Sequence, residues 1–275
     1  MDTNLKYNSL KTILGSLKKV VVAYSGGVDS TFLLKVSVDV LGAENVVCCL
    51  GTSPSLAASQ KRVALEMAEE IGVSVRQVAV SELDDPDYSA NKADRCFHCK
   101  SHLFGLLGKI ADDEGIENVI CGSNFDDLDD YRPGNRAAKA LGVGAPLMEA
   151  KLTKDEIREL SKQLGLRTAE MPATPCLASR VSYGVEITAD KLKQIDRAED
   201  YLRSLGFVEF RVRHHDNVAR IEVHEEDIPR VIENRGNILS NLKSIGFKYA
   251  ALDLQGFRSG SLNESLTEEQ KRKNI

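Results

Sequence analysis

The sequence predicts an α/β fold, a parallel sheet with helices on both faces, followed by a smaller α+β domain. Continuous apolar runs, typical of strands buried on both faces, alternate with amphipathic segments of helical period. A glycine-rich turn separates the first apolar run from the helix that follows it. The chain has 275 residues, enough for about two domains of ordinary size.

Helices and strands are expected to alternate through the first domain, residues 1–182. The expected helices are 6–18, 31–41, 56–71, 96–114, 137–141 and 154–164. The expected strands are 19–24, 45–50, 73–80 and 118–121. The polar segment 81–95 and the proline-rich segment around Cys176 are expected to be loops.

The composition changes after Gly184, and a weak internal repeat follows. Residues 202–207 (LRSLGF) resemble residues 242–247 (LKSIGF), and each copy leads from a helix into a strand. The expected strands here are 208–213, 218–223 and 249–254. The order helix–strand–strand–helix–strand predicts a small α+β domain over 183–263, and the charged tail 264–275 is expected to fray.

Composition excludes several classes of protein. The 36 Lys and Arg against 41 Asp and Glu give a net charge of −5, which argues against a protein held to nucleic acid mainly by phosphate contacts. No apolar run approaches the roughly 20 residues of a membrane span, and the N-terminus has no apolar signal segment. We therefore expect a cytoplasmic protein without membrane or nucleic-acid partners, whose six cysteines are reduced.

The first expected strand ends in a candidate phosphate-binding loop, Ser25-Gly26-Gly27-Val28-Asp29-Ser30. The two glycines let the backbone approach an anion, and the N–H groups at the helix start favour phosphate. The two serines add hydroxyl donors. Asp29 is expected to cap the turn or to help hold Mg²⁺. The loop is neither a Walker A sequence nor a dinucleotide-binding fingerprint.

The cysteines fall into two groups. Cys48, Cys49 and Cys121 lie in expected strands and are predicted to pack in the core. The other three, Cys96, Cys99 and Cys176, lie in loops or at a helix start, where the helix dipole favours thiolates.

Three chemistries fit these three thiols. They can hold a 4Fe–4S cluster with one iron left open, or hold structural zinc together with His102. Alternatively, Cys96 and Cys99 can form a redox pair that serves a nucleophilic Cys176. The spacing leaves all three open. His98 and His102 are expected on the helix surface or behind the ligands rather than as ligands themselves.

The phosphate loop resembles the SGGxDS loop of the ATP-pyrophosphatase (PP-loop) family. The resemblance implies a Rossmann-like fold that cleaves ATP to AMP and pyrophosphate, after a substrate oxygen attacks the α-phosphate. Backbone N–H groups and Mg²⁺ would neutralise the departing pyrophosphate. Residues 122–127 match a second family element, which implies that Gly122 binds ATP and that Asp126 or Asp127 faces the nucleotide or metal.

Segments between residues 25 and 260 together resemble one branch of that family, the LarE-type sulfur transferases of nickel-pincer nucleotide biosynthesis. The matching segments are 25–30, 130–134, Cys176 with 179–180, 183–184, Glu199 with 201–207, 211–213, 219–222, 252–254 and 256–260. The resemblance implies that two carboxylates of pyridinium-3,5-biscarboxylic acid mononucleotide are adenylated and converted to thiocarboxylates.

The resemblance also bears on the sulfur source. In the single-cysteine form of the family, the residue matching Cys176 gives up its own sulfur and becomes dehydroalanine. That form has an aromatic residue at the position of Cys96 and no counterpart of Cys99. This chain instead resembles the three-cysteine form, which implies a 4Fe–4S cluster on Cys96, Cys99 and Cys176. Sulfide or another sulfur donor is then a partner.

Further site residues lie in the C-terminal part. Arg211 and Arg213 alternate along a strand, so both are expected on one face, which the resemblance implies binds phosphate and meets neighbouring subunits. It also implies roles at the substrate for Arg180 and Glu199, a lysine near the site at Lys100, and a homohexamer. The rival functions are a tRNA thiolase, an amide-forming PP-loop ligase such as an NAD synthetase, and a nucleotide-binding module with structural zinc.

Overall fold

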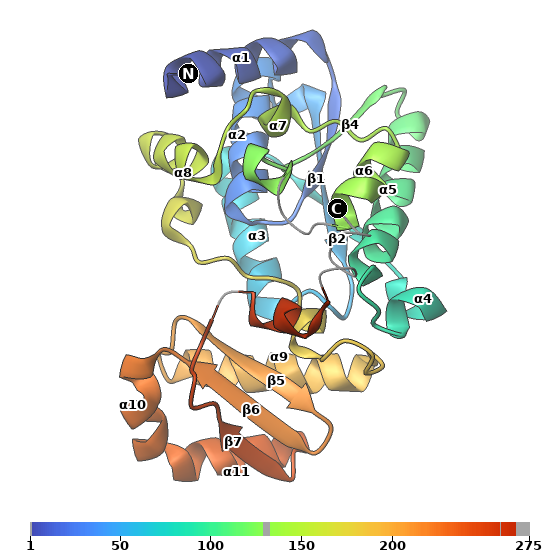
Figure 1. The fold of residues 1–275 in the computed structure, drawn as a ribbon. Helices are drawn as coiled ribbons and strands as arrows, with labels where there is room; N and C mark the ends of the chain where they lie inside the picture. The colour runs from blue at the N-terminus through green and yellow to red at the C-terminus, as the bar shows by residue number, and fades with distance from the viewer. Residues whose placement is uncertain (1, 129–132, 259, 268–275) are drawn as a thin grey trace.

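The structure is a computed structural model that describes residues 2–128, 133–258 and 260–267. Figure 1 shows a larger α/β part above a smaller part with its own sheet, as predicted. The helices are α1 (Thr3–Ser16), α2 (Val28–Leu41), α3 (Ala58–Ile71), α4 (Pro86–Ser89), α5 (Arg95–Asp113), α6 (Pro133–Ala140), α7 (Pro146–Glu149), α8 (Lys154–Gln163), α9 (Ala189–Ser204), α10 (Ile228–Glu233) and α11 (Arg235–Ile245). The strands are β1 (Val20–Tyr24), β2 (Val46–Thr52), β3 (Val75–Ala79), β4 (Asn118–Cys121), β5 (Phe210–His215), β6 (Val218–Val223) and β7 (Tyr249–Leu252).

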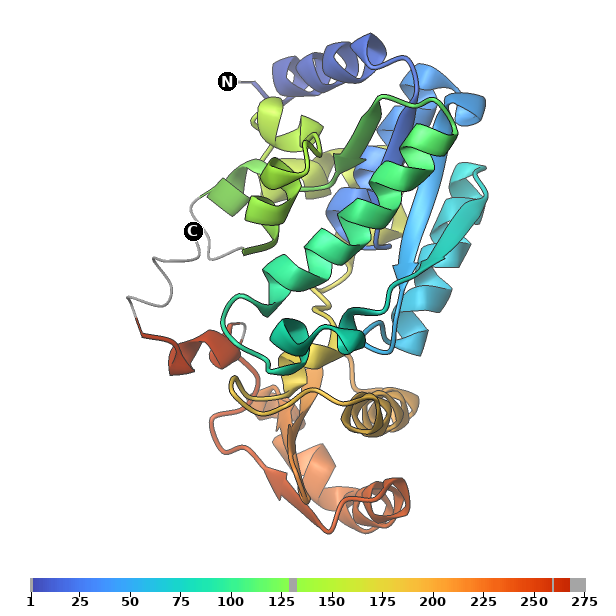
Figure 2. The same ribbon diagram turned by 90° about the vertical axis from the view of Figure 1, so that its right-hand side faces the viewer.

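The larger sheet is parallel, with the strand order β3-β2-β1-β4. Every residue of β1 is buried, because α2 and α8 contribute to a core on one face and α5 and α6 to a core on the other. Figure 2 shows α5 lying along its face of the sheet. The chain runs from β1 toward β2 on one side, whereas β4 lies on the other. This arrangement opens a crevice at the carboxyl ends of β1 and β4, where ligands bind in such folds.

The segment 81–95 is not the loop that the sequence predicts. It contains the short 3-10 helix Glu82–Asp84 and the helix α4. The side chain of Asp85 accepts a hydrogen bond from the backbone N–H of Asp87, and Pro86 occupies the first helical position. An N-cap followed by proline starts a helix even in a polar segment, and the burial of Tyr88 fixes it against the protein.

The smaller sheet has the order β5-β6-β7, antiparallel and then parallel. The two copies of the internal repeat lie at the C-terminal ends of α9 and α11. Their phenylalanines, Phe207 and Phe247, are buried in one core between the helices and the sheet. The start of the expected tail does not fray. Ser261–Ser265 forms a 3-10 helix and Leu266 is buried, whereas residues 268–275 lie outside the described part of the chain.

A fourth hydrophobic cluster joins the two parts of the molecule. It consists of Ala57, Tyr88, Leu177, Ala178, Val181, Ile187, Leu192 and Ile195. A backbone bridge between Val181 and His214 adds to it. The segment that follows Cys176 is therefore packed between the larger part and the smaller part of the molecule.

The pH dependence of stability should reflect His214. Burial lowers the pKa of this imidazole to about 4, and its Nδ1 has no hydrogen-bond partner in the described structure. Because the unfolded chain takes up the proton near pH 6.5, we expect the unfolding free energy to fall as the pH decreases from about 6.5 to about 4. For His214→Gln, the unfolding free energy measured with urea should change less steeply with pH over this range. His224→Gln, at a partly exposed ring, should retain the slope of the unchanged chain, and equal slopes in both variants would contradict the assignment.

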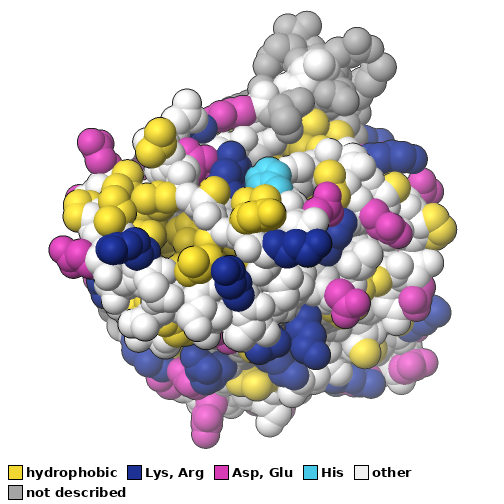
Figure 3. Space-filling model, turned by 90° about the horizontal axis from the view of Figure 1, so that it is seen from below, with side chains coloured by type: hydrophobic (Ala, Val, Ile, Leu, Met, Phe, Trp, Pro, Cys, Tyr) yellow, Lys and Arg dark blue, Asp and Glu magenta, His cyan; other side chains and the backbone are white. Residues whose placement is uncertain are grey.

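The underside of the molecule carries mixed charges, with hydrophobic side chains gathered on one side (Figure 3). Large hydrophobic side chains of the C-terminal part are exposed at Val208, Ile232, Leu239, Tyr249 and Leu254. Among the described residues, no helix combines the length and apolar character needed to cross a membrane.

Candidate active site

The phosphate loop has the predicted position between β1 and α2, and its own hydrogen bonds shape it. The Ser25 hydroxyl lies 2.9 Å from that of Ser30, and the Ser30 hydroxyl also accepts the N–H of Ser25 at 3.2 Å. Gly26 has φ +75°, and a Cβ added there would lie 2.5 Å from the Cβ of Ala64 on α3. The loop therefore requires glycine at this position, both for its backbone angle and for the approach of α3.

The end of β4 lies against this loop. A Cβ added at Gly122 would lie 2.9 Å from the backbone nitrogen of Ser30, so a larger residue would push the strand end away. Asp127 lines the cavity beside the loop and accepts a hydrogen bond from the N–H of Asn124 at 3.1 Å. Asp126 instead accepts the N–H of Lys154 at the start of α8. Of the two expected carboxylates, the structure brings Asp127 to the cavity.

Asp29 does not cap the turn with its side chain. Both carboxylate oxygens bind the ammonium of Lys154, at 2.7 and 2.8 Å. Asp29 also lines the cavity, and its side chain is partly exposed. When a nucleotide brings Mg²⁺, a carboxylate at this place can bind the ion in place of the lysine. The expected role of Asp29 in holding Mg²⁺ therefore stays a prediction.

One cavity of about 630 Å³ takes in the phosphate loop, the ends of β2, β3 and β4, one face of α5 and part of β5. The three cysteines singled out above line it, together with Pro133 and Gly134. The rest of the matched segment, residues 130–132, lies outside the described residues. The volume is in the range of sites that enclose a small-molecule ligand.

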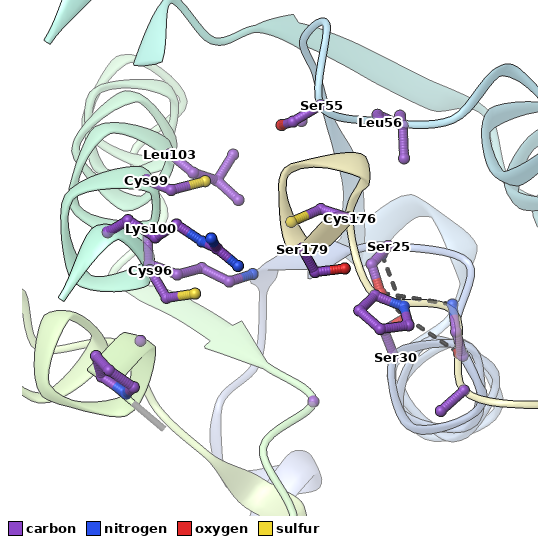
Figure 4. Close-up of a pocket in the computed structure, with 18 of the residues that line it drawn as sticks. Ser25, Ser30, Ser55, Leu56, Cys96, Cys99, Lys100, Leu103, Cys176 and Ser179 are labelled. Atoms are coloured by element: carbon purple, nitrogen blue, oxygen red, sulfur yellow. Dashed lines mark hydrogen bonds between the residues drawn. The ribbon is translucent and has the colours of Figure 1, made fainter. Parts of the chain in front are cut away.

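The three thiols face the same space (Figure 4). Cys96 and Cys99 project from the first turns of α5, and Cys176 projects from the segment before the 3-10 helix Leu177–Arg180. Cys176 is exposed, the other two are partly buried, and all six cysteines of the chain are free thiols. Cys48, Cys49 and Cys121 are buried, which confirms their predicted packing.

The electrostatics of these thiols differ from the sequence expectation. The helix start was expected to favour thiolates, but burial raises the pKa of Cys99 to about 12 and also raises that of Cys96. Desolvation outweighs the helix dipole here, so both thiols stay protonated in the metal-free protein. Metal binding to them would release protons.

Polar residues that the sequence analysis missed also line the cavity near the thiols. Glu82 is fully buried, one of its oxygens accepts the Ser55 hydroxyl at 2.6 Å, and the other has no hydrogen-bond partner in the described structure. Arg95 is buried, hydrogen-bonds Asn91, and stacks on the Tyr183 ring at 4.9 Å. Ser55 and Glu82 follow the ends of β2 and β3, a position that could have singled them out.

Arg180 and Glu199 bind each other beneath the cavity. Their side chains are 1% and 3% exposed, and two N–H···O bonds of 2.8 and 2.9 Å join them. Arg180 also donates to the carbonyls of Pro175 and Cys176, at 2.7 and 3.2 Å. Neither side chain lines the cavity. The pair therefore fixes the loop that carries Cys176.

Arg211 and Arg213 both lie on the cavity side of β5, as their spacing predicts. Arg213 is held by Glu222 at 2.8 Å and by the carbonyl of Ser179 at 2.7 Å. Arg211 donates to the carbonyl of Ala173 at 3.0 Å, and burial lowers its pKa to about 10, so it stays charged at neutral pH. Both arginines therefore line the same cavity as the phosphate loop, with Arg213 paired to a buried carboxylate.

Comparisons with known proteins agree with this geometry. A family model described as NAD synthase matches residues 8–96. Pyridinium-3,5-bisthiocarboxylic acid mononucleotide synthase of Lactiplantibacillus plantarum is 38% identical over 265 residues, 96% of each chain. An uncharacterised protein of Synechocystis is 44% identical over 264 residues, 95% of this chain and 98% of its own. A glutamine-hydrolysing GMP synthase of Bdellovibrio bacteriovorus is 30% identical over 209 residues, 68% of this chain and 40% of its own.

A phosphate loop at a parallel-sheet switch point, matched by an NAD synthase family model, defines an α/β enzyme of the PP-loop ATP-pyrophosphatase class. The near-complete match to the Lactiplantibacillus synthase narrows the class further. The chain belongs to the LarE-type family of ATP-dependent sulfur transferases.

Proposed function

We propose that this enzyme adenylates the carboxylates of pyridinium-3,5-biscarboxylic acid mononucleotide and converts them to thiocarboxylates, with sulfur delivered at Cys96, Cys99 and Cys176. The substrate class is supported by the 38% identity to a synthase of the corresponding bisthiocarboxylic acid mononucleotide. The single observation that carries the proposal is the shared cavity, in which three thiols face the same space as the phosphate loop. A carboxylate activated at the loop can then meet sulfur without leaving the protein.

The first half-reaction would use the loop of β1 and α2. A substrate carboxylate oxygen attacks the α-phosphorus of ATP, the bond to the β-phosphate oxygen breaks, and pyrophosphate leaves. The Ser25 and Ser30 hydroxyls and the backbone N–H groups of Gly26 and Gly27 would stabilise the departing charge. Mg²⁺ held by Asp29 and Asp127 would add to it.

A 4Fe–4S cluster fits the three-thiol site. The site offers three free thiols from two separate segments and an open cavity in front of them. Three thiolates leave one iron without a protein ligand, and when bound, the cluster would supply a sulfide to the acyl-adenylate. Thiocarboxylate formation would join this sulfur to the acyl carbon, and AMP would leave with the electron pair of the broken C–O bond. Arg211 and Arg213 would hold the substrate phosphate during both steps.

The proposal is tested by separating the two half-reactions. With the dicarboxylate mononucleotide and ATP, we expect pyrophosphate release without added sulfide and thiocarboxylate formation, seen by mass spectrometry, only with a sulfur-loaded enzyme. Pyrophosphate release that does not depend on the dicarboxylate would contradict the proposal that the dicarboxylate mononucleotide is the substrate. Dehydroalanine at position 176 after one turnover would show that Cys176 itself, and not a cluster, is the sulfur source.

We further propose the division into a catalytic domain, 1–182, and a substrate and assembly domain, 183–263, in a cytoplasmic homohexamer without nucleic-acid or membrane partners. The exposed Tyr249, on the edge strand β7, and the exposed Leu254 support an assembly surface in the C-terminal part. Light scattering after size exclusion should give six times 30.2 kDa. Tyr249→Lys should reduce that mass, whereas a monomeric unchanged chain would contradict the assembly.

A further inference from the structure

We propose a second metal site, for a divalent first-row cation such as Zn²⁺, on the outer face of α5. Its ligands are His98, His102, Asp85 and Asp87. Nitrogen and carboxylate ligands of this kind suit zinc and its neighbours in the first transition row. The site is independent of the proposed sulfur transfer, because it uses no group of the cavity described above.

The ligand atoms are already close to a coordination geometry. One ligand atom each from Asp85, Asp87 and His98 all lie within 4.8 Å of one another. The Nδ1 of His98 lies 3.5 Å from the Oδ2 of Asp85, and the Nε2 of His102 lies 2.9 Å from the same oxygen. Bonds of about 2.0–2.2 Å to a tetrahedral zinc place neighbouring ligand atoms about 3.3–3.6 Å apart. The spacing of Asp85 and His98 already matches this value, whereas His102 lies outside the 4.8 Å group and would join the site by rotation of its side chain.

The two histidines lie one turn apart on α5 and so share a face, which adjoins the face of Cys96 and Cys99 because Cys99 and His102 are three residues apart. Neither histidine lines the cysteine cavity. This placement argues against a zinc site made of the three cysteines and His102, which the sequence left open. The imidazole of His102 is committed to Asp85 instead.

A carboxylate stands behind one of the rings. The Oδ2 of Asp94 lies 3.8 Å from the Nε2 of His98, and its Oδ1 is buried with no hydrogen-bond partner among the described residues. Metal-binding histidines commonly donate their second N–H to such a carboxylate, which fixes the ring. The arrangement leaves the Nδ1 of His98 facing Asp85, ready for a metal.

The local charge favours a cation. Three carboxylates, those of Asp85, Asp87 and Asp94, surround the histidines. The competing cation is Lys92, whose ammonium lies 3.4 Å from Asp87. That pair is weak, because both side chains are more than 60% exposed, at 63% and 61%. A divalent ion would displace it.

A metal ion bound at this site would stabilise the wall of the cysteine cavity. Asp85 and Asp87 flank the start of α4, whose Tyr88 packs in the same hydrophobic cluster as Cys99. A metal bridging α4 to α5 would hold these two helices together from the outer side. The site would thus be structural rather than catalytic.

The test needs the full chain without competing thiols. We would replace Cys96, Cys99 and Cys176 by alanine, with serine replacements as a second background, and titrate Co²⁺ while recording visible absorption. One Co²⁺ per chain with a nitrogen- and oxygen-ligand spectrum is expected, displaced by Zn²⁺. His98→Ala and His102→Ala should each weaken the affinity by on the order of 100-fold, and Asp94→Asn by about tenfold.

The matched control is His224→Ala, which removes an imidazole paired with Glu209 at 3.1 Å elsewhere in the chain and should leave Co²⁺ affinity unchanged. Zn²⁺ should also raise the thermal midpoint of the chain that lacks Cys96, Cys99 and Cys176, but not when His98→Ala and His102→Ala are added to it. Equal Co²⁺ affinity of this three-cysteine variant with and without the two histidine substitutions, with both proteins folded by circular dichroism, would overturn the site.

Discussion

Replacing Cys176 by alanine should abolish thiocarboxylate formation, by on the order of 10³-fold or more, while ATP-dependent pyrophosphate release continues. The reason is the separation of the two sets of groups. The phosphate loop keeps its own hydrogen bonds between Ser25 and Ser30, whereas Cys176 stands on a different segment and is the exposed thiol of the three. Pyrophosphate and thiocarboxylate measured in the same reaction distinguish the two activities.

The control for this variant is Cys121→Ala, at a thiol that also borders the cavity but is only 6% exposed and lies 3.5 Å from the Ser123 hydroxyl. It should keep both activities. Unchanged thiocarboxylate formation by Cys176→Ala would remove this thiol from the sulfur path. Loss of both activities would mean that Cys176 also serves ATP activation.

Arg180→Ala should lower the unfolding free energy by about 3–5 kcal/mol, because it leaves the buried carboxylate of Glu199 without its partner. The same variant loses the bonds to the carbonyls of Pro175 and Cys176, so the Cys176 loop should loosen. Urea unfolding measures the first effect, and the rate of Cys176 alkylation in the folded variant measures the second.

Arg167→Ala is the matched control, since Arg167 pairs with Glu70 on the surface, where the side chains are 60% and 52% exposed. This substitution should lower the unfolding free energy by between about 0 and 1 kcal/mol. Equal losses in the two variants would show that the Arg180–Glu199 pair adds nothing beyond a surface ion pair.

Much of the nucleotide half of the site could be predicted from the sequence. The loop at Ser25–Ser30 and the strand Asn118–Cys121 follow from apolar runs that end in glycine and polar residues, which is a local pattern. Parallel strands then place both ends at one edge of the sheet. The repeat that ends in Phe207 and Phe247 was equally local, and it marks two helix ends as expected.

The rest depended on contacts between distant segments. Arg180 and Glu199 are 19 residues apart, and only the packing of α9 against the Cys176 loop shows that they bind each other rather than face the cavity. The raised pKa of Cys99 reflects burial, which outweighed the helix start. His102 binds Asp85, the residue that caps α4. The sequence analysis missed α4 because the segment 81–95 is polar.

We propose that Cys96, Cys99 and Cys176 hold a cluster beside the ATP site. The most direct test of this proposal is the content of iron, acid-labile sulfide and zinc in protein purified without oxygen, with Cys96→Ala and Cys121→Ala beside the unchanged chain. We expect about four irons and four sulfides per chain, lost in Cys96→Ala and retained in Cys121→Ala. Zinc bound in the unchanged chain and lost in Cys96→Ala, with no iron, would contradict the cluster, as would the absence of both metals.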